Sequence, residues 1–387
     1  MRICLIYDCL FPYTVGGAER YYRSLAERLA SEGHHVTFVT LRQWDRGAVP
    51  QVTGFEVDTA GPRMALYAGS GRRRVLPPIV FGLGVFWHLL RFGRRYDAVQ
   101  CASFPYFSLL AAALARGAGR FRLVVDWHEV WTRSYWREYL GAVGGEVGWL
   151  VQRLCTRIPQ RAFCFSNLHG ARLRAEGFRG EITVLPGEWS GPLQPMPVQD
   201  AEQLVVFAGR HIPEKRVLAI PPAIELARKR LPELRCAILG DGPDRPELLR
   251  LVAELRLVEV IDVPGFVATA QVEEALGRAL CMLLPSRREG YGLVVLEAAA
   301  RATPSVVVAG PDNAAVELVA EGENGFIARS ASHEDLAAAI LTVHEAGAAV
   351  RDSTAKWFAR NAPQMSLERT MKVVLEAYDD IRPHAAA

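Results

Sequence analysis

Short apolar runs alternate with segments of helical periodicity along most of the chain. The predicted strands of the first half are Arg2–Asp8, Val36–Leu41, Ala98–Ala102, Leu123–Asp126 and Ala162–Ser166. The predicted helices between them are Glu19–Ala30, Pro105–Arg116 and Glu146–Arg157, and Gly33 and Gly117 mark the ends of the first two. Apolar strands separated by helices indicate a parallel sheet that is covered on both faces.

A stretch rich in proline and glycine, Pro186–Pro197, interrupts this alternation and is typical of a linker. The pattern then restarts, with predicted strands at Leu204–Ala208, Cys236–Leu239, Val258–Val263, Cys281–Leu284 and Ser305–Val308. The predicted helices are Val217–Lys229, Arg245–Leu255, Leu293–Arg301, Glu334–Ala346 and Leu367–Ile381. We therefore predict an α/β protein with two doubly wound Rossmann-like domains, 1–187 and 203–363, a linker at 188–202 and a terminal helical segment at 364–387.

One segment, Val75–Leu90, is as apolar as a membrane helix. Its 16 residues, which include Pro77 and Pro78, fall short of the roughly 20 needed to span a bilayer. The flanking arginines are Arg72, Arg73, Arg74, Arg91, Arg94 and Arg95. Basic flanks around a helix with aromatic residues favour peripheral contact with an anionic membrane, while a helix that covers a sheet would be equally apolar.

Composition and charge narrow the class of protein. Half of the 387 residues are hydrophobic, which excludes wholesale disorder, and the net charge of +3 is too small to indicate a nucleic-acid binder. Residues 1–188 carry 24 Arg and 15 Asp or Glu, or +9, which leaves −6 for the rest. Seven widely spaced cysteines argue against a disulfide framework or zinc site and favour a reduced, cytoplasmic setting. The N-terminus is too short for a signal peptide and predicts a strand instead.

Two candidate binding features lie in the first half. The turn after the first strand lacks the G-x-G-x-x-G of dinucleotide-binding enzymes, and Gly16 and Gly17 open a helix there. Adjacent glycines at a helix N-terminus suit an anionic ligand, although an ordinary turn has the same sequence. His128 follows a later strand, at the edge of the sheet where α/β proteins bind ligands, or else it is a histidine satisfied within its loop.

In the second half, Arg210 and Lys215 flank a loop between a strand and a helix. Two fixed cations there suit a diphosphate, and the alternative is a solvated basic loop. Gly240 and Gly242 form a tight turn after the next strand, which is a plausible edge for a nucleobase.

The most specific signal is the segment Leu284–Glu297, in which a strand enters a glycine-containing loop and then a helix. The backbone N–H groups of Gly290, Tyr291, Gly292 and Leu293 would point at an anion. Glu289 precedes them and Glu297 lies in the helix, where carboxylates accept hydrogen bonds from hydroxyl groups. The alternative, two surface glutamates, fits the neighbouring glycines less well.

These motifs resemble a retaining glycosyltransferase of family 4. Glu289 and Glu297 match the E-x7-E pattern of that family, and Arg210 and Lys215 match its diphosphate-binding pair. Further matches are Gly16–Gly17, His128, Gly240–Pro243, Gly265–Val267 and Gly322–Phe326, in the order of the family and over nearly the whole chain. The resemblance implies the GT-B fold, in which two Rossmann-like domains face each other across a cleft and the terminal helix returns to the first domain.

The resemblance also implies roles for single residues. Lys215 and Arg210 would neutralise the diphosphate of a nucleotide sugar, Glu297 would bind ribose hydroxyls, and Glu289 would hold the donor sugar. His128 would meet sugar and acceptor, and Gly17 would approach the phosphate or the acceptor. Val267, Gly240 and Gly242 belong to the donor-binding set. The donor would be of the UDP or GDP type, and the acceptor a glycan, a lipid-linked sugar or a small molecule.

We expect no cofactor and no metal, because the chain has no D-x-D sequence and Asp379 and Asp380 fit a solvated helix face. The sequence departs from the family in two places, Pro186–Glu188 and Gly310–Ala314, and the second faces the donor in that family. Two other functions remain open at this point: a GT-B-shaped sugar-nucleotide epimerase, and a non-catalytic sugar-binding protein.

Overall fold

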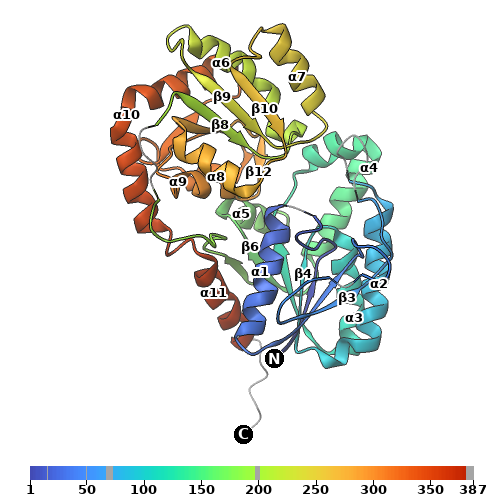
Figure 1. Cartoon of the computed structure of the whole chain (residues 1–387). Coiled ribbons are helices and arrows are strands. Elements are labelled where there is room, and N and C mark those ends of the chain that lie inside the picture. The colour runs from blue at the N-terminus through green and yellow to red at the C-terminus, as the bar shows by residue number, and fades with distance from the viewer. Residues whose placement is uncertain (15, 49, 67–72, 197–200, 381–387) are drawn as a thin grey trace. The chain divides into compact units, whose positions relative to one another are not determined.

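The structure is a computed structural model that describes residues 1–14, 16–48, 50–66, 73–196 and 201–380 (Figure 1). Arg72, Ile381 and the side chains of Asp379 and Asp380, on which the sequence analysis drew, lie outside the described part. The chain forms two compact units. One comprises described residues up to 186 together with those from 370 onward, and the other comprises residues 187–369.

The first unit is built on a parallel sheet in the order β3-β2-β1-β4-β5-β6-β7. The strands are β1 (Arg2–Ile6), β2 (His35–Thr40), β3 (Glu56–Thr59), β4 (Ala98–Ala102), β5 (Arg122–Trp127), β6 (Arg161–Cys164) and β7 (Ile182–Val184). The central strand β1 pairs with two neighbours, so that Ile3 lies opposite Val36 on one side and Ala98 on the other. The predicted doubly wound sheet is confirmed, with β3 and β7 as additional strands.

The helices of the first unit are α1 (Gly17–Ser31), α2 (Leu76–Phe92), α3 (Tyr106–Gly119), α4 (Arg133–Thr156), α5 (Asn167–Ala175) and α11 (Leu367–Asp380), most of which belongs to this unit. A short 3-10 turn, Gly93–Arg95, follows α2. The prediction that Gly117 ends α3 was wrong, because the helix continues to Gly119 and Arg120 caps it at φ 59°. The predicted start of α4 was also wrong, because its first turns bury Tyr135 and Trp136 ahead of a kink at Gly141.

The second unit repeats the plan with a parallel sheet in the order β10-β9-β8-β11-β13-β15. Its strands are β8 (Leu204–Ala208), β9 (Arg235–Leu239), β10 (Ile261–Gly265), β11 (Cys281–Leu284), β13 (Ser305–Val308) and β15 (Gly325–Ala328), and a small separate pair joins β12 (Arg288–Glu289) to β14 (Asp312–Asn313). The helices are α6 (Ile220–Arg228), α7 (Arg245–Glu254), α8 (Thr269–Arg278), α9 (Leu293–Ala299) and α10 (His333–Asn361), with 3-10 turns at Pro213–Lys215, Val217–Ala219 and Ala314–Leu318.

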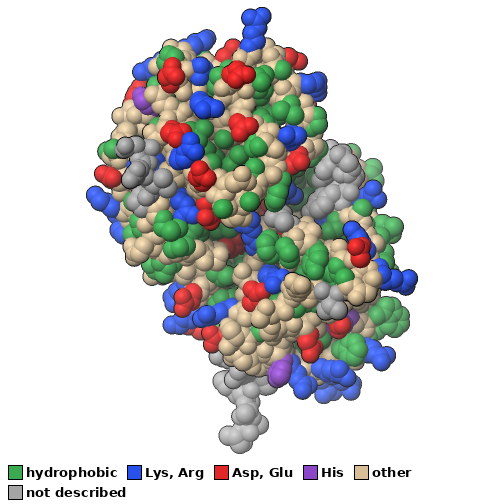
Figure 2. Space-filling model, in the orientation of Figure 1, with side chains coloured by type: hydrophobic (Ala, Val, Ile, Leu, Met, Phe, Trp, Pro, Cys, Tyr) green, Lys and Arg blue, Asp and Glu red, His purple; other side chains and the backbone are tan. Residues whose placement is uncertain are grey.

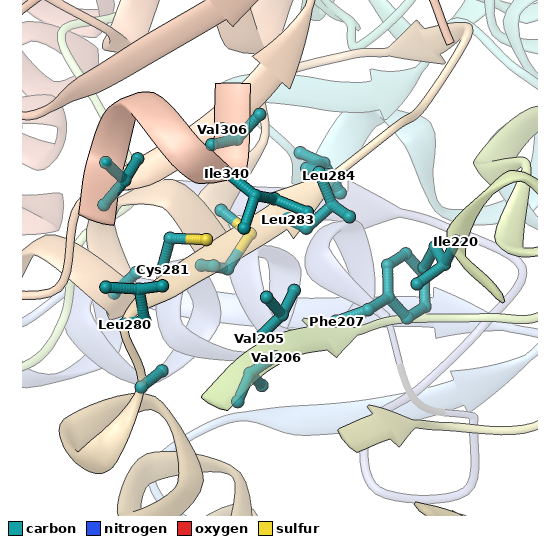
Figure 3. Close-up of a cluster of buried hydrophobic side chains, with 14 of the residues drawn as sticks. Val205, Val206, Phe207, Ile220, Leu280, Cys281, Leu283, Leu284, Val306 and Ile340 are labelled. Atoms are coloured by element: carbon teal, nitrogen blue, oxygen red, sulfur yellow. The ribbon is translucent and has the colours of Figure 1, made fainter. Parts of the chain in front are cut away.

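The core of the second unit lies between this sheet and its helices. Val205, Val206, Leu283 and Val306 from three adjacent strands and Ile340 of α10 belong to one cluster of buried side chains (Figure 3). Such burial explains why β8, β11 and β13 were predicted to the residue, because each is a continuous apolar run. All seven cysteines are free and buried, as expected for small core side chains without disulfides.

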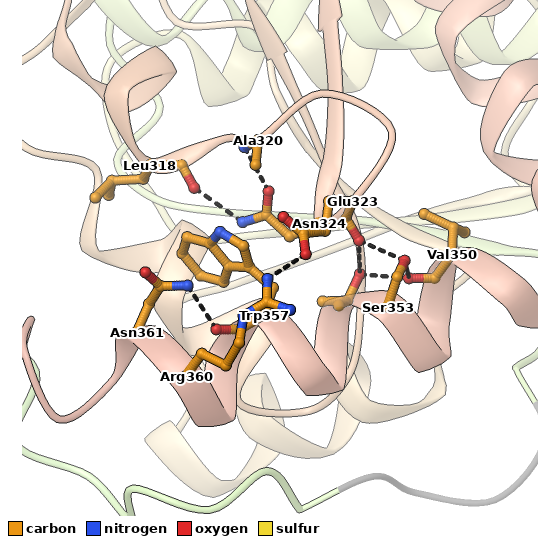
Figure 4. A network of polar contacts seen from close by, with 10 residues as sticks. Leu318, Ala320, Glu323, Asn324, Val350, Ser353, Trp357, Arg360 and Asn361 are labelled. Atoms are coloured by element: carbon orange, nitrogen blue, oxygen red, sulfur yellow. Dashed lines mark hydrogen bonds and ion pairs between the residues drawn. The ribbon is translucent and has the colours of Figure 1, made fainter.

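The loop Gly322–Phe326, one of the runs that matched the family, is held by a polar network (Figure 4). The Asn324 side chain accepts a hydrogen bond from the Ala320 N–H at 2.7 Å and donates one to the Leu318 carbonyl at 2.9 Å. The Ser353 hydroxyl of α10 donates to the Glu323 carbonyl at 2.6 Å. These contacts fix the turn that leads into β15, so the residues of Gly322–Phe326 stabilise the fold.

Helix α2 corresponds to the apolar segment predicted at Val75–Leu90. The apolar run extends further than predicted, to Leu76–Arg95, and by length and composition alone it is able to cross a bilayer. Core helices of water-soluble proteins meet the same criterion, and 39% of the run is buried in the unit. Arg73, one of the predicted flanking arginines, is 10% exposed and pairs with Asp8.

The inner face of α2 packs so closely that two of its glycines leave no room for a side chain. A Cβ at Gly82 would lie 2.6 Å from the Cβ of Phe107 on α3, and one at Gly84 would lie 1.8 Å from the Ala60 carbonyl oxygen. A Cβ at Gly117, by contrast, would meet nothing within 4 Å. Close packing therefore attaches α2 to its neighbours by one face and leaves the opposite face outward.

We predict that Gly84→Ala lowers the stability of the protein by about 1–3 kcal/mol, because the added methyl group must displace the backbone after β3. Gly117→Ala is the matched control and should raise stability by about 0.5–1 kcal/mol, since alanine favours a helix interior. Urea unfolding followed by circular dichroism measures both. Equal stability of the two variants would contradict the packing described for α2.

Candidate functional site

The strongest polar contact among the predicted site residues joins two loops of the second unit. Lys215 ends the 3-10 turn that follows β8, and Glu289 lies in the loop that follows β11. The Lys215 ammonium forms an ion pair with Glu289 Oε1, and the two side chains are 19% and 10% exposed. The sequence analysis placed both residues in one site, but it did not foresee that they contact each other.

Arg210, the other predicted cation, precedes this pair in the same loop. Its side chain is exposed, and within the described residues it forms no ion pair or hydrogen bond. A guanidinium that is already in place without a carboxylate partner is available to an anionic ligand. The loop therefore presents one paired and one open cation within six residues of each other in sequence.

The turn after β9 lies against the loop after β8, backbone to backbone. Gly240 has φ 126°, and a Cβ there would lie 1.9 Å from the Gly209 carbonyl oxygen. A Cβ at Gly242 would lie 2.3 Å from the His211 carbonyl oxygen. Glycine is required at both positions by this close approach, and the glycines thereby fix the position of the loop that carries Arg210 and Lys215.

His211, which the sequence analysis did not single out, lies in this contact. Its side chain is fully buried, and neither ring nitrogen has a hydrogen-bond partner in the described residues. Burial lowers the pKa of His211, so the ring is neutral at pH 7. In the sequence, only its position next to Arg210 could have pointed to His211 as a residue of the site.

The loop after β11 turns sharply into α9. Glu289 is buried and its short strand pairs with β14, so the Gly310–Ala314 segment holds the backbone at Glu289. Gly292 has φ 96° and caps the helix, and a Cβ there would lie 2.6 Å from Ala315 Cβ. Gly290, Tyr291 and Leu293 complete this turn as partly exposed residues.

Glu297 and Val267, the remaining predicted residues of this unit, are both half-buried. Glu297 lies in α9, on the turn after Leu293, and Val267 follows β10. Burial, and then the Glu188 carboxylate, raises the pKa of Tyr291, which places that ring beside the start of the segment predicted as a linker. The loops after β8, β9, β10 and β11 all leave the carboxyl edge of one sheet, so the predicted donor residues gather there.

In the first unit, Gly16 and Gly17 open α1 as predicted. Gly16 is the N-cap in an extended conformation, and a Cβ there would meet the flexible end of the Glu19 side chain. A Cβ at Gly17 would meet nothing within 4 Å, so the backbone at this glycine is open on that side.

His128 follows β5 in an aromatic surrounding. Its ring stacks on Phe165 with centroids 4.1 Å apart and meets the edge of Tyr21 at 5.8 Å. Burial lowers the pKa of His128 to about 4, opposed by Glu129 and assisted by His169. The ring is therefore neutral at pH 7, and its buried Nε2 has no partner among the described residues. A neutral imidazole offers one hydrogen bond to a ligand, not a proton to a leaving group.

A fully buried polar network, missed by the sequence analysis, supports β5 just before His128. Asp126 accepts hydrogen bonds from the Tyr22 hydroxyl at 2.5 Å and from the Gln100 amide at 2.7 Å. The Tyr378 hydroxyl of α11 donates to the other end of Gln100. Burial raises the pKa of Asp126 to about 7, and the two hydrogen bonds oppose that shift. The network joins α1, β4, β5 and α11 beneath the histidine.

The lowered pKa of His128 predicts a pH dependence of stability. In the unfolded chain this histidine takes up a proton near pH 6.5, whereas in the folded protein it does so near pH 4. Its contribution is thus present above pH 6.5 and is lost as the pH falls toward 4. Relative to His128→Phe, which keeps the ring stacking, the unfolding free energy should fall by about 2 kcal/mol between pH 7 and pH 5. Parallel pH profiles of the two proteins in urea unfolding would show that His128 does not have the lowered pKa.

The chain matches two families of sugar-transferring enzymes in succession. Residues 15–187 match Glycosyltransferase Family 4, and residues 194–365 match Glycosyl transferases group 1. The alpha-D-kanosaminyltransferase of Streptomyces kanamyceticus is 31% identical over 129 residues, which make up 33% of this chain and 33% of that enzyme. The match thus spans about a third of the length of this curated relative.

Solved structures share the fold over almost the whole chain. Sucrose-phosphate synthase from Thermosynechococcus elongatus has a TM-score of 0.81 at 19% identity, with 98% of each chain covered. HepE from Anabaena in complex with UDP-glucose has a TM-score of 0.74 at 16% identity, with 98% of this chain and all of that chain covered. The chain belongs to the group 1 glycosyltransferases and has their GT-B fold.

Proposed function

We propose that the protein transfers a sugar from a nucleotide-diphosphate sugar of the UDP or GDP type to an acceptor hydroxyl, with retention of the anomeric configuration and without a metal ion or cofactor. The observation that carries this proposal is the Lys215–Glu289 ion pair, with the open guanidinium of Arg210 in the same loop. A carboxylate for a sugar hydroxyl and two cations for a diphosphate are what such a donor requires.

Transfer of this kind requires positive charge that stabilises the leaving diphosphate, and it requires no nucleophile from the protein. As the bond between the anomeric carbon and the diphosphate breaks, negative charge grows on the leaving group, and Lys215 and Arg210 stabilise it. In retention without a covalent intermediate, the acceptor hydroxyl attacks from the face that the diphosphate leaves, and its proton passes to an oxygen of the departing diphosphate. The described residues contain no cluster of three or more His, Cys, Asp or Glu arranged for a metal ion, so we assign the counter-charge to the cations.

The remaining residues receive roles that follow from their place in the fold. Glu297 binds the ribose hydroxyls, and the backbone of Gly290–Leu293 holds the donor. The turn of Gly240 and Gly242, with Val267, borders the nucleobase. Neutral His128 contacts the sugar and the acceptor by a hydrogen bond, and the open backbone of Gly17 approaches the phosphate or the acceptor. The HepE structure with UDP-glucose shows that a protein of this fold binds such a donor.

We further propose that the first unit receives the acceptor, which is a glycan, a lipid-linked sugar or a small molecule. This unit carries the positive charge of the chain, +9 over residues 1–188, and an outward apolar face on α2. Both features favour an acceptor presented at an anionic membrane surface, on the cytoplasmic side.

A direct test separates transfer from the two other functions. Purified protein is incubated with UDP- and GDP-sugars, and the released nucleotide diphosphate is measured with and without candidate acceptors. A transferase releases it in step with a glycosylated product that keeps the anomeric configuration of the donor. An epimerase would convert the donor sugar without acceptor, and a sugar-binding protein would bind without turnover. Either of those results would overturn the proposal.

We predict that Lys215→Ala lowers kcat by about 10²–10³-fold, because the lost cation acts on charge that grows in the transition state. Lys229→Ala, at the end of α6 in the same unit, is the matched control and should keep full activity. Lys215→Arg keeps the charge and the partner of Glu289, and should recover part of the rate. Full activity of Lys215→Ala would remove this residue from the mechanism.

Glu297→Ala should raise KM for the donor more than it lowers kcat, because ribose contacts are made both before and during the reaction. Initial-rate kinetics at varied donor concentration distinguish the two effects. An unchanged KM in a folded variant would show that Glu297 does not bind the donor.

Activity should survive treatment with EDTA, since fixed cations take the place of a metal ion at the diphosphate. The rate is compared before chelation, after chelation, and after addition of Mg²⁺ or Mn²⁺. Complete loss that is restored by either ion would contradict metal-independent transfer.

A further inference from the structure

Exposed apolar side chains are concentrated on one layer of helices in the first unit. Of the eighteen large apolar side chains that are exposed in the described part of the chain, eleven lie on α2, α3, α4 or the residue before α2. They are Val75, Leu76, Leu83, Trp87, Leu90, Leu114, Leu140, Val143, Val147, Leu150 and Leu154. Helix α3 packs against both α2 and α4, so these side chains belong to one continuous layer.

Within this layer, two helices carry an apolar stripe on the face turned away from the core. On α2 the stripe is Leu76, Leu83, Trp87 and Leu90, and on α4 it is Val143, Val147, Leu150 and Leu154. Both sets follow the spacing of three, four or seven residues that places side chains on one side of a helix. Trp87 is 68% exposed and Val143 is 80% exposed, so neither stripe is covered within the unit. Contiguous apolar surface of this kind marks an interaction site.

The segments that follow the three helices are strongly basic. Residues 91–97, 116–122 and 153–160 contain eight arginines and one acidic residue, Asp97. They border a cleft of about 1240 Å³, lined by Arg94, Arg116, Arg120 and Arg122 together with Tyr96 and Pro159. Figure 2 shows basic and hydrophobic side chains next to each other along the edge of the first unit where α2 and α3 lie in Figure 1.

Two of the four arginines of the cleft donate hydrogen bonds to backbone carbonyls. Arg94 donates to the Ala118 carbonyl at 3.2 Å, and Arg116 donates to the Pro159 carbonyl. Among the described residues, none of the four guanidinium groups forms an ion pair. Burial, and then the neighbouring Arg122, lowers the pKa of Arg116, which reflects the crowding of like charge. The cleft is thus a preformed place for anionic groups from outside the chain.

We propose that this face of the first unit, the outer stripes of α2 and α4 with the arginine-lined cleft at the ends of α2 and α3, docks on an anionic phospholipid bilayer. The apolar side chains enter the interfacial region, and the cleft receives lipid phosphate groups. This inference deepens the acceptor side of the proposed function, and it rests on that function only for the conclusion that the acceptor is lipid-linked.

The charges favour a bilayer over the other occupants of an apolar face. In a symmetric pair of copies, the same basic segments would meet each other, with one aspartate per copy to offset eight arginines. A soluble phosphate ligand would explain the cleft but not the two apolar stripes. An anionic bilayer offers both hydrocarbon for the apolar stripes and phosphate groups for the cleft. The close packing of Gly82 and Gly84 keeps α2 attached by its inner face, so the contact is peripheral.

The test is sedimentation with lipid vesicles of phosphatidylcholine, with and without 30 mole per cent phosphatidylglycerol. The protein should bind the anionic vesicles, and 1 M salt should release most of it because charge screening then acts within about 3 Å. Replacing Arg94 and Arg122 with Ser and Arg120, which has positive φ, with Asn should weaken binding about 100-fold. Leu83→Ser with Trp87→Ser should also weaken it by at least 10-fold.

Two control variants carry equal changes in the second unit. The triple variant Arg230→Ser, Arg235→Ser and Arg250→Ser removes the same charge, and Leu249→Ser with Val258→Ser removes exposed apolar side chains. Both should bind vesicles as the wild type does. Absence of binding, equal binding to neutral and anionic vesicles, or formation of a dimer that covers α2 in sedimentation velocity would each overturn the proposal. Turnover of nucleotide sugar by the same samples is measured separately, so loss of transfer with retained docking would refute the transferase function alone.

Discussion

The candidate donor site depends on one partly buried ion pair, Lys215–Glu289. Glu289 lies in a loop that leaves β11, where a lone carboxylate would be costly to bury, and Lys215 from the loop after β8 offsets that cost. The pair therefore holds two separate loops at one spacing. In the proposed function, a sugar hydroxyl would contact the carboxylate and a diphosphate would contact the ammonium, so each ligand group would meet a charge that the pair already holds in place. The stability of the loops and the electrostatics of the site come from the same contact.

Glycine makes that spacing possible in the rest of the site. Gly240 and Gly242 let the turn after β9 touch the backbone of the β8 loop, and Gly292 lets the turn into α9 touch Ala315. A side chain at any of these positions would push the loops apart and move Lys215 relative to Glu289. The backbone of His211 bonds to the turn after β9, through Asp241 and Asp244, while its side chain is buried and has no hydrogen-bond partner among the described residues.

Much of the fold could be predicted from the sequence, because most strands are continuous apolar runs. The strands β4, β8, β11 and β13 were placed to the residue, because they are apolar except for Gln100 in β4 and Ser305 in β13. The strands β3 and β7 were missed because half or more of their residues face solvent or are only partly covered, so their periodicity is weak. The start of α4 was missed because the kink at Gly141 breaks its helical pattern. The local sequence therefore predicts those strands and helices whose residues are buried in a regular pattern.

For the site, too, the sequence did not predict contacts between residues that are far apart in the chain. Motif spacing pointed to Lys215 and Glu289, yet their pairing joins residues 74 positions apart. The network of Asp126, Gln100 and Tyr378 spans 278 positions, and its members look like isolated polar residues within apolar segments.

The exposed side chains of the first unit carry information about binding rather than about the fold. An exposed leucine costs a fold little, so eleven exposed apolar residues are no defect of stability. Their confinement to three adjacent helices is the informative feature, because scattered residues would not coincide with the basic ends of those helices. The segments after these helices hold eight arginines and one acidic residue, so basic charge lies next to this apolar surface. Charge and apolar area on one face oppose burial against another copy of the chain and favour a surface that offers both phosphate and hydrocarbon.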